Sequence, residues 1–447
     1  MDSPMEERPA EVLRATAAKH AGEASTPRWG WVEPMVWTRR MLQALDQGVK
    51  GDRWFSLMDK VWSPKNLRRS FEIVKANDGA AGVDRQTIAM FEKHLEANLE
   101  KLSQELRERR YRPSAVRRVW IDKPGSAQQR PLGIPSVRDR VVQTALRNVM
   151  EPIFEKDFAQ HSYGFRPNRG CKDALRRLEH LLKGGYRWVV DADLKSYFDT
   201  IPHERLMKKV ALKISDRDLL DLIGMYLKQP VEDDGSTWEP HEGSPQGAVI
   251  SPLLSNIYLD DLDHLMVREG QEMVRYADDL VVMCRSQQEA QRAMDTLRTW
   301  AQANGLTLHP TKTRIVDANG PDGFDFLGYH FVRGMKWPRD KSLMKFRETI
   351  RHKTKRTSGQ SMEHIVGEVN QMLRGWFEYF KHSKETTFPY LDGWIRMRLR
   401  SILRRRLGLR GRGRGADNQR WPNIYFARLG YFSLKAAHAC ALRSSRR

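Results

Sequence analysis

Apolar residues recur at helical spacing in several stretches of the chain, and this pattern predicts its main helices. In residues 131–158, Ser136 is a suitable N-cap. The residues after it form one apolar stripe: Val137, Val141, Ala145, Val149 and Ile153. Ser251 and Pro252 predict the start of a second helix, with the serine as cap and the proline at the first helical position, running to about Met266.

Three further segments show the same helical tendency. Residues 31–74 are predicted to be helical, residues 288–304 form an amphipathic helix that ends at Gly305, and residues 366–380 repeat apolar side chains every three or four positions. Residues 1–30 are polar without sustained periodicity, so we expect them to be loosely ordered.

Shorter runs of β-forming residues predict strands over 186–193 and 324–332. Residues 273–276 and 280–284 flank the triplet at 277–279, which predicts a hairpin with two carboxylates at its tip. Strands and helices alternate irregularly around this hairpin. The pattern indicates an α+β domain with an antiparallel sheet and helices packed on one face.

Composition narrows the class of protein. A chain of 447 residues with a net charge of +21 suggests two to four domains and a polyanionic partner, with nucleic acid first and an anionic membrane second. No apolar run approaches the ~18 residues of a membrane-spanning helix, and the N-terminus lacks a secretory pattern. The three cysteines lie far apart, which excludes a disulfide framework and a CxxC zinc pair. We therefore expect an intracellular protein.

The positive charge is concentrated at the C-terminal end. From Asp340 onward there are 25 Lys and Arg against 8 Asp and Glu, a net charge of +17, whereas the preceding residues hold 52 against 48, a net of +4. Aromatic residues are interleaved with these basic ones, which suits RNA, because aromatic rings stack on unpaired bases. Residues 396–414 are the most basic and predict a helix that runs into a basic loop. A solvated basic face without a specific partner is the alternative.

The motif YADD, residues 276–279, is the sharpest chemical feature. Adjacent acids between apolar strands repel each other and are costly to bury unless a cation neutralises them. A second cluster, VVDADLKSYFD, carries Asp191 and Asp193 on one face of a strand, with Asp199 beyond a turn. If the two clusters meet, they can bind two Mg²⁺ ions for phosphoryl displacement. Asp-Asp is also an ordinary turn pair, and Asp191 and Asp199 can be structural.

These two motifs, in this order, resemble the palm of a reverse transcriptase, and further segments resemble group II intron-encoded reverse transcriptases and maturases. The segments are KPGSAQQRPLGIPSVRDRVVQTAL, HSYGFRPNRGCKDAL, GSPQGAVISPLLSNIYLDDLD, GLTLHPTKT, FDFLGYHF and LRGWFEYFKHS, followed by RW and LGYFSL. The resemblance covers about residues 61–434. It implies right-hand polymerase fingers and palm with an antiparallel palm sheet, then an α-helical thumb or maturase domain. The expected divisions are 1–60 for an N-terminal extension, 61–335 for fingers and palm, and 336–447 for the basic helical domain.

The resemblance also implies roles for particular residues. Asp193, Asp278 and Asp279 match the catalytic, metal-binding acids, with the backbone carbonyl of Leu194 as an extra ligand for two Mg²⁺ ions, which Mn²⁺ could replace. The expected nucleotide-binding residues are Lys123 and Arg130 for the triphosphate, Phe198 as the steric gate, Gln246 at the incoming nucleotide, and Lys312 near the leaving pyrophosphate. Surface charge is the alternative for Lys123, Arg130 and Lys312, and a tight turn is the alternative for the segment around Gln246.

In the tail, the expected RNA-binding residues are Arg374, Trp376, Arg404, Arg405 and Arg406. The implied partners are the group II intron RNA, an RNA template with a DNA primer, target DNA and dNTPs, with no membrane. The implied location is the bacterial cytoplasm, at the nucleoid, and dimerisation is left open. The chain shows no His/Cys-rich endonuclease cluster, so second-strand cleavage is not expected, and Ala248 stands where many members have Gly. Two alternatives are an RNA-binding splicing cofactor with a vestigial polymerase, and a retron, diversity-generating or domesticated reverse transcriptase.

Overall fold

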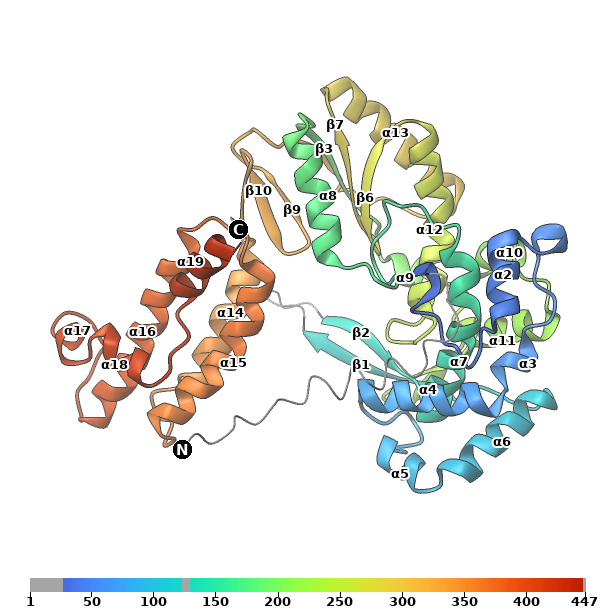
Figure 1. The fold of residues 1–447 in the computed structure, drawn as a ribbon, viewed down its shortest axis with the longest axis horizontal. Helices are drawn as coiled ribbons and strands as arrows, with labels where there is room; N and C mark the ends of the chain where they lie inside the picture. Colours follow the sequence, from blue (N-terminus) through green and yellow to red (C-terminus); the bar gives the residue numbers. More distant parts are fainter. Residues whose placement is uncertain (1–26, 123–128, 445–447) are drawn as a thin grey trace, which may run out of the picture.

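The computed structural model describes residues 27–122 and 129–444. Lys123 and residues 1–26 lie outside these ranges. Within the described residues, no helix is both long enough and apolar enough to cross a membrane. The N-terminal helices and the C-terminal helices lie at opposite ends of the molecule, and strands occupy the region between them (Figure 1).

The N-terminal part is a helical layer built around one long helix, α7 (Val137–Glu155). Ser136 caps this helix as expected, because its Oγ accepts a hydrogen bond from the Asp139 amide at 3.2 Å, and the predicted apolar stripe is buried. The other elements of this part are η1 (Pro27–Trp29), α2 (Arg39–Gln47), η2 (Lys50–Asp52), α3 (Met58–Val61), α4 (Pro64–Asn77), α5 (Ile88–Lys93) and α6 (Leu95–Arg107). The prediction of a helix through residues 31–74 was wrong in detail. Gly48, with φ of 90°, ends α2, and Pro64 starts α4.

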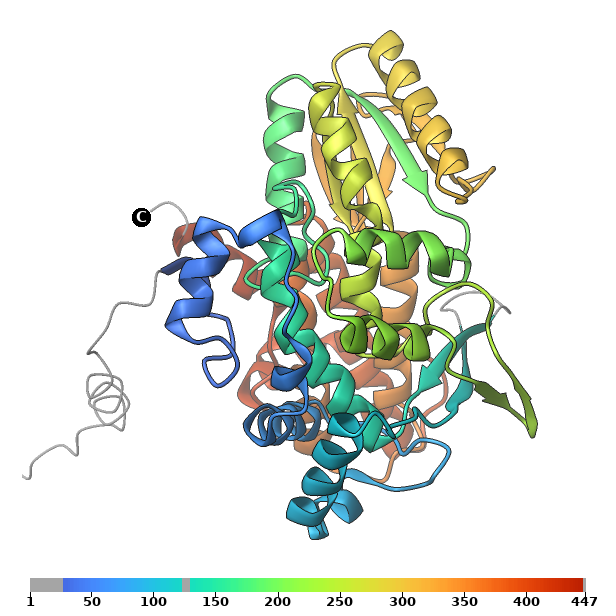
Figure 2. The same cartoon turned by 90° about the vertical axis from the view of Figure 1, so that its right-hand side faces the viewer.

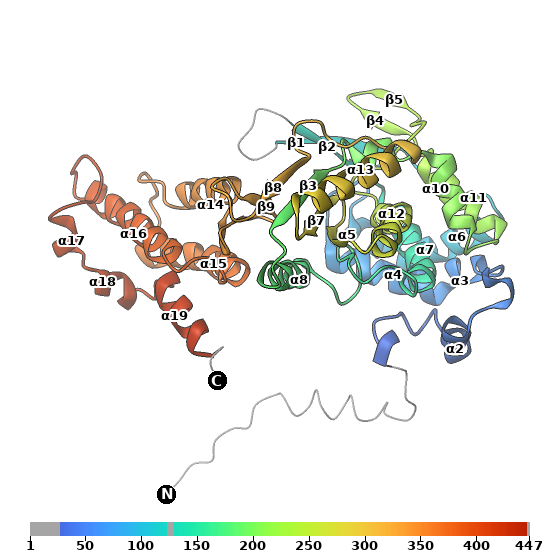
Figure 3. The ribbon, with the colours of Figure 1, turned by 90° about the horizontal axis from the view of Figure 1, so that it is seen from above.

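A four-stranded sheet in the order β2-β1-β4-β5 extends from this layer. Its central strand β1 (Val116–Asp122) pairs antiparallel with β2 (Gln129–Ile134) and parallel with β4 (Val231–Asp233), which forms a hairpin with β5 (Ser236–Trp238). The β4–β5 hairpin projects from the body of the protein (Figure 3).

The second four-stranded sheet has the order β6-β7-β3-β8 and is antiparallel throughout. Its strands are β3 (Trp188–Asp193), β6 (Glu272–Tyr276), β7 (Asp279–Cys284) and β8 (Arg314–Asp317). One face packs on α12 (Ser251–Arg268) and α13 (Gln287–Ala303), and the other packs on α8 (Cys171–Lys183) (Figure 2). The expectation that helices cover only one face was wrong, because neighbouring residues such as Val189 and Val190 are both fully buried.

Around this sheet, short helices fill the space toward the N-terminal layer: α9 (Tyr197–Thr200), α10 (His203–Ala211) and α11 (Arg217–Leu227). Helix α12 begins at Ser251, with Ile250 at the N-cap, so the predicted serine cap was wrong by one position. The Ser251 hydroxyl instead donates to the Pro245 carbonyl at 2.9 Å, which ties the helix start to the preceding loop.

A three-stranded sheet, β11-β10-β9, lies between the second four-stranded sheet and the C-terminal helices (Figure 1). The predicted single strand at 324–332 is in fact two strands, β9 (Phe324–Phe326) and β10 (Tyr329–Val332), and β11 (Met335–Pro338) completes the sheet. Leu327 and Gly328, with φ of 45° and 82°, form the turn that divides them.

The C-terminal helices have a hydrophobic core of their own. They are α14 (Asp340–Lys353), α15 (Met362–Phe380), α16 (Thr387–Arg406), α17 (Asp417–Arg420), α18 (Asn423–Arg428) and α19 (Leu434–Ser444). The apolar stripe predicted around residues 366–380 lies in α15 and faces this core, except for Phe380, which packs with the residues of the three-stranded sheet. The basic segment 396–414 is the second half of α16 followed by an irregular loop, as expected.

Candidate active site

Asp193 and Asp279 stand opposite each other on neighbouring antiparallel strands. Asp193 ends β3, Asp279 begins β7, and the register pairs them directly. Asp278 lies in the turn just before Asp279, so the turn carries one of the two carboxylates and the strand carries the other. Cross-strand neighbours have Cβ atoms about 4.5–5.5 Å apart. Three carboxylates therefore gather at one edge of the sheet.

The turn before Asp278 is held from behind by a buried network. Ala277 has a φ of 59°, a left-handed conformation that is unfavourable for alanine. Arg275, fully buried in β6, donates to the Ala277 carbonyl at 2.9 Å and to Asn256 Oδ1 at 3.0 Å. Its Nε donates to Asp263 Oδ1 at 2.7 Å. Sequence reasoning missed this support, although an arginine in an otherwise apolar strand beside YADD was a visible signal.

The loop before α8 makes a second contact with the turn at Ala277, through the backbone of Gly164. A Cβ built on Gly164 would lie 2.2 Å from the Ala277 amide nitrogen, so only glycine allows this backbone approach. Asn256 fixes the loop by donating to the Gly164 carbonyl at 2.9 Å. Arg166 also fixes this loop. Its guanidinium donates to the Glu155 carboxylate and, at 2.8 Å, to the Ser162 carbonyl.

The carboxylates destabilise one another's charged form. Burial, with the nearby Asp191 and Asp278, raises the pKa of Asp279 to about 7. Burial also raises the pKa of Asp278, and Asp193 adds to the effect. The pKa of Asp191 rises to about 6 because of burial, although Arg314, with its Nε 3.7 Å from Asp191 Oδ2, opposes the shift. A cation placed among these groups would relieve the repulsion.

The donor set suits Mg²⁺ or Mn²⁺, because carboxylate oxygens are the ligands these hard cations prefer. Among the described residues, no three acidic, histidine or cysteine side chains form a ready ligand cluster. The carboxylate of Asp193 forms an ion pair with Lys312 and so faces that lysine. Leu194 follows Asp193. Its side chain is buried, and its backbone forms an isolated antiparallel β-bridge with Leu308. The role of the Leu194 carbonyl as a ligand stays a prediction.

Two of the expected nucleotide-binding residues line one cavity of about 610 Å³. These are Phe198, which follows β3 in α9, and Gln246, in the loop before α12. The Phe198 carbonyl accepts a hydrogen bond from the Ser244 amide at 2.6 Å, which holds the two segments together. Lys312 lies instead at the acids, Arg130 is exposed on β2, and Lys123 is outside the described residues.

The loop that carries Gln246 is fixed to strand β2. The Gly133 amide donates to the Gln246 carbonyl at 2.6 Å. A Cβ on Gly247, whose φ is 106°, would lie 2.2 Å from the Gly133 carbonyl oxygen. Gly247 is therefore required for this approach, and the next residue, Ala248, is buried.

Sequence reasoning did not identify Arg118 and Trp238, which line the same cavity. The Arg118 guanidinium lies 4.7 Å from the ring centroid of Trp238 and 5.7 Å from that of Trp120. Asp199 also lines this cavity; burial raises its pKa, and Arg118 opposes the shift. The run RRVW, residues 117–120, in which two arginines stand close to a tryptophan, was the available signal for Arg118.

The five expected RNA-binding residues have different surroundings. The Trp376 ring packs between Phe346 and Phe380, with centroids 4.6 and 4.8 Å away, so it contributes to the core. Arg374 is exposed above Phe432. Arg404 pairs with the buried Asp417 at 2.9 Å, Arg406 donates to the Gln360 carbonyl, and Arg405 is exposed.

Two family models match the chain. Residues 121–331 match reverse transcriptase (RNA-dependent DNA polymerase), and residues 343–421 match the group II intron maturase-specific domain. The first therefore includes all three acids at the sheet edge, and the second includes α15 and α16.

Similar proteins include Protein YkfC of Escherichia coli (strain K12), which is 34% identical over 346 residues, covering 68% of this chain and 86% of the relative. Group II intron-encoded protein LtrA of Lactococcus lactis subsp. cremoris is 40% identical over 173 residues, 39% of this chain and 29% of the relative. A partial Cas6-RT-Cas1--Cas2 complex is similar over 56% of this chain and 41% of that one, with 25% identity and a TM-score of 0.36.

The order of the matched domains, and the YADD acids opposite Asp193 within the first of them, give the chain the domains of an RNA-directed DNA polymerase. The chain belongs to the family of group II intron-encoded reverse transcriptases and maturases.

Proposed function

We propose that this chain extends a DNA primer on an RNA template, and that it binds a group II intron RNA to assist splicing and support retromobility. The observation that carries the polymerase activity is the pairing of Asp193 with Asp279, with Asp278 beside them, at one sheet edge. The substrates would be dNTPs, the template with its primer, and target DNA. Because target DNA would be among its partners, the expected location is the bacterial cytoplasm, at the nucleoid.

Asp193, Asp278 and Asp279 would hold two Mg²⁺ ions. When bound, these ions would make the primer 3′-hydroxyl more acidic and neutralise charge that develops on the phosphate. Asp193 must then turn its carboxylate from Lys312 toward the cations. The released Lys312 Nζ stays beside the site, where it can donate a proton to the departing pyrophosphate.

The cavity with Phe198 and Gln246 would hold the sugar and base of the incoming nucleotide, with the phenyl ring excluding a 2′-hydroxyl. Arg130 and Lys123 would hold the triphosphate in line with the primer. In this proposal, residues 61–335 carry out polymerisation and residues 336–447 bind RNA.

Primer extension on an RNA template with Mg²⁺ tests the polymerase proposal. Asp278→Asn should abolish extension while RNA binding persists, since it removes a ligand charge and leaves the basic tail intact. Asp322→Asn, an exposed acid outside this site, is the matched control and should extend primers like wild type. Full extension by Asp278→Asn would contradict the proposal. RNA binding without extension by wild type would favour a splicing cofactor with a vestigial polymerase.

A further inference from the structure

A cavity of about 340 Å³ in the C-terminal helices is lined by arginines. It lies between the end of α14, the middle of α16 and the basic loop that follows α16. Its arginines are Arg351, Arg356, Arg398, Arg412 and Arg414. Trp394 lines it too, and the lining that the structure describes contains no Asp or Glu.

Arg398 is the most firmly placed of these cations. Its Nε donates to Thr354 Oγ1 at 2.6 Å, and its other donors reach the Thr354 carbonyl at 3.1 Å and the Arg351 carbonyl at 3.3 Å. All these acceptors are neutral. Burial lowers the pKa of Arg398, and repulsion from Arg351, Arg356 and Arg412 lowers it further. The cavity thus concentrates positive charge without a balancing carboxylate in its described lining.

The basic loop is anchored so that Arg412 and Arg414 line this cavity. The Gly413 amide donates to Ser401 Oγ at 2.9 Å. A Cβ on Gly413 would lie 2.5 Å from Arg400 Cβ, so the loop can approach α16 only with glycine there. Gly413 is the anchor point between Arg412 and Arg414.

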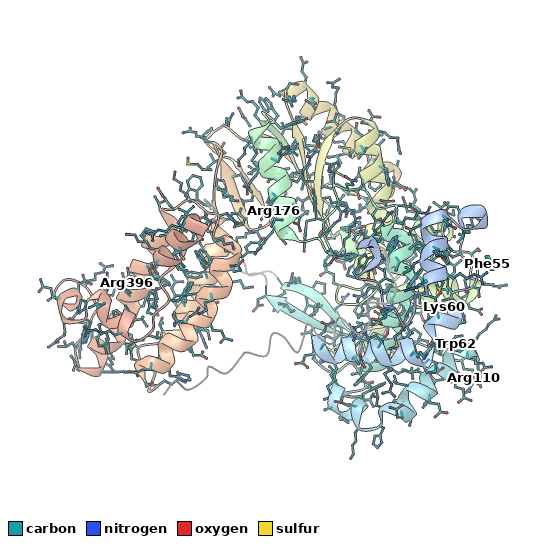
Figure 4. All side chains as sticks on the ribbon, viewed as in Figure 1. Phe55, Lys60, Trp62, Arg110, Arg176 and Arg396 are labelled. Carbon is teal, nitrogen blue, oxygen red and sulfur yellow. The ribbon has the colours of Figure 1, made fainter. Side chains whose placement is uncertain are left out.

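A neighbouring cavity of about 570 Å³ continues the basic surface. It shares Met397 and Arg414 with the first and adds Arg396 and Arg400. Arg396 is labelled on the C-terminal helices in Figure 4. Arg396 lies 3.8 Å from Asp392, so the second cavity is partly neutralised. The two cavities are therefore neighbours that share the Arg414 and Met397 side chains in their linings.

We propose that the arginine-lined cavity holds a backbone phosphate of an unpaired RNA strand, with the attached nucleoside against Trp394 and the strand continuing past Arg414. Guanidinium groups match phosphate oxygens in paired hydrogen bonds. A volume of about 340 Å³ is at the lower end for small-ligand pockets and suits one nucleotide, whereas a duplex is far too wide. The choice of RNA rests on the proposed function, since the maturase-specific match at 343–421 includes every residue of the cavity.

Binding of a 12-nucleotide single-stranded RNA to the full chain, measured across a salt series, tests the assignment. The double variant Arg412→Gln/Arg414→Gln is the first choice, because both residues sit on an exposed loop and the fold should survive. It should bind about tenfold more weakly and reduce the salt slope by about 0.7 for each phosphate that it no longer neutralises. Arg428→Gln, an exposed arginine on α18 outside both cavities, is the control and should change affinity by less than about twofold.

A photocrosslink locates the nucleotide. The same RNA carrying 4-thiouridine should crosslink to the peptide that contains Trp394 and Met397 in wild type and in Arg428→Gln, and much less in the double variant. Crosslinks only elsewhere, or equal affinity and salt slope in the double variant and the control, would overturn the proposal. Equal binding and crosslinking of the same sequence as DNA would overturn the RNA assignment.

Failure here is distinguishable from failure of the proposed function. If wild type extends primers but the arginine variants bind RNA normally, only the cavity assignment falls. If wild type does not extend primers but crosslinks at Trp394 as expected, only the polymerase proposal falls.

Discussion

The Arg275 guanidinium and the Asp263 carboxylate form an ion pair whose side chains are 0% and 1% exposed, directly behind the turn that carries Asp278. Arg275→Met would leave Asp263 buried without its partner. We expect the free energy of unfolding to fall by about 3–5 kcal/mol, measured by urea denaturation. Primer extension should also fall under conditions where the variant is folded.

The double variant Arg275→Met/Asp263→Leu is the control for that prediction. It removes both charges and should recover much of the stability. Extension should stay low, because the hydrogen bond to the Ala277 carbonyl is still missing. Recovery of extension in the double variant would show that the arginine acts only on stability.

Metal binding should be visible in the thermal stability of the protein. Mg²⁺ at ten times its Kd should stabilise wild type by about 1.4 kcal/mol, because it relieves repulsion among the acids. Asp279→Asn should show little Mg²⁺-dependent change in Tm, and Asp322→Asn should respond like wild type. An equal Mg²⁺ response in all three proteins would place the metal elsewhere.

Phe198→Ala should relax sugar selection. Removing the ring opens the 610 Å³ cavity next to Gln246, so a 2′-hydroxyl would fit. We expect the ratio of rNTP to dNTP incorporation to rise by about tenfold or more, as measured by single-nucleotide extension. Trp238→Ala, in the same cavity but on the β4–β5 hairpin, is the comparison; a similar ratio in both variants would contradict a specific gate.

Arg404 and Arg405, neighbours at the end of α16, should differ in what their loss affects. Arg404→Gln leaves the buried Asp417 without its partner, so it should lower stability by about 1–3 kcal/mol. Arg405→Gln should instead weaken RNA binding and flatten its salt dependence, with little change in Tm. Unfolding curves and filter binding of both variants decide between these effects. An unchanged salt slope for Arg405→Gln would mean that this side chain does not meet RNA.

Asp260 on α12 should make stability depend on pH. Burial raises its pKa to about 6, Asp263 adds to the shift, and His264, 3.5 Å away, opposes it. The folded-state pKa is above the unfolded one, so this stabilising contribution is complete below about pH 4 and is lost as pH rises through about 6. The loss can reach about 3 kcal/mol. Asp260→Asn should flatten this part of the curve in urea titrations at pH 4.5 and 7.5; a curve parallel to wild type would exclude the carboxyl as its cause.

The catalytic strands were predictable because their signals are local. The β-rich run before Asp193 and the two runs around YADD gave the strands, and the acids at their ends indicated where they meet. Arg275 escaped notice because a buried arginine is rare, and its partner Asp263 lies on a helix earlier in the chain. The arginine beside YADD was visible in the sequence, but its pairing with Asp263 depends on tertiary packing that no local pattern encodes.

Two fold predictions failed for physical reasons that are visible afterwards. The pairs Val189–Val190 and Val281–Val282 are apolar on consecutive positions, which indicates a sheet buried on both faces, so a single covered face was the wrong interpretation. Leu327-Gly328 interrupts residues 324–332, and the glycine marked the turn. The ion pair between Lys312 and Asp193 was not predictable, since it depends on strand β8 lying beside β3.

The contact of Gly164 with the Ala277 amide joins two backbones without any intervening side chain. No flexible side chain lies between the two backbones at this point. A shift of the loop that carries Gly164 would therefore move the turn that carries Asp278. Directed evolution of this polymerase should therefore tolerate changes at the tip of the projecting β4–β5 hairpin, Asp234 and Gly235, far more readily than any lengthening or shortening of the loop from Ser162 to Arg166, which contains Gly164.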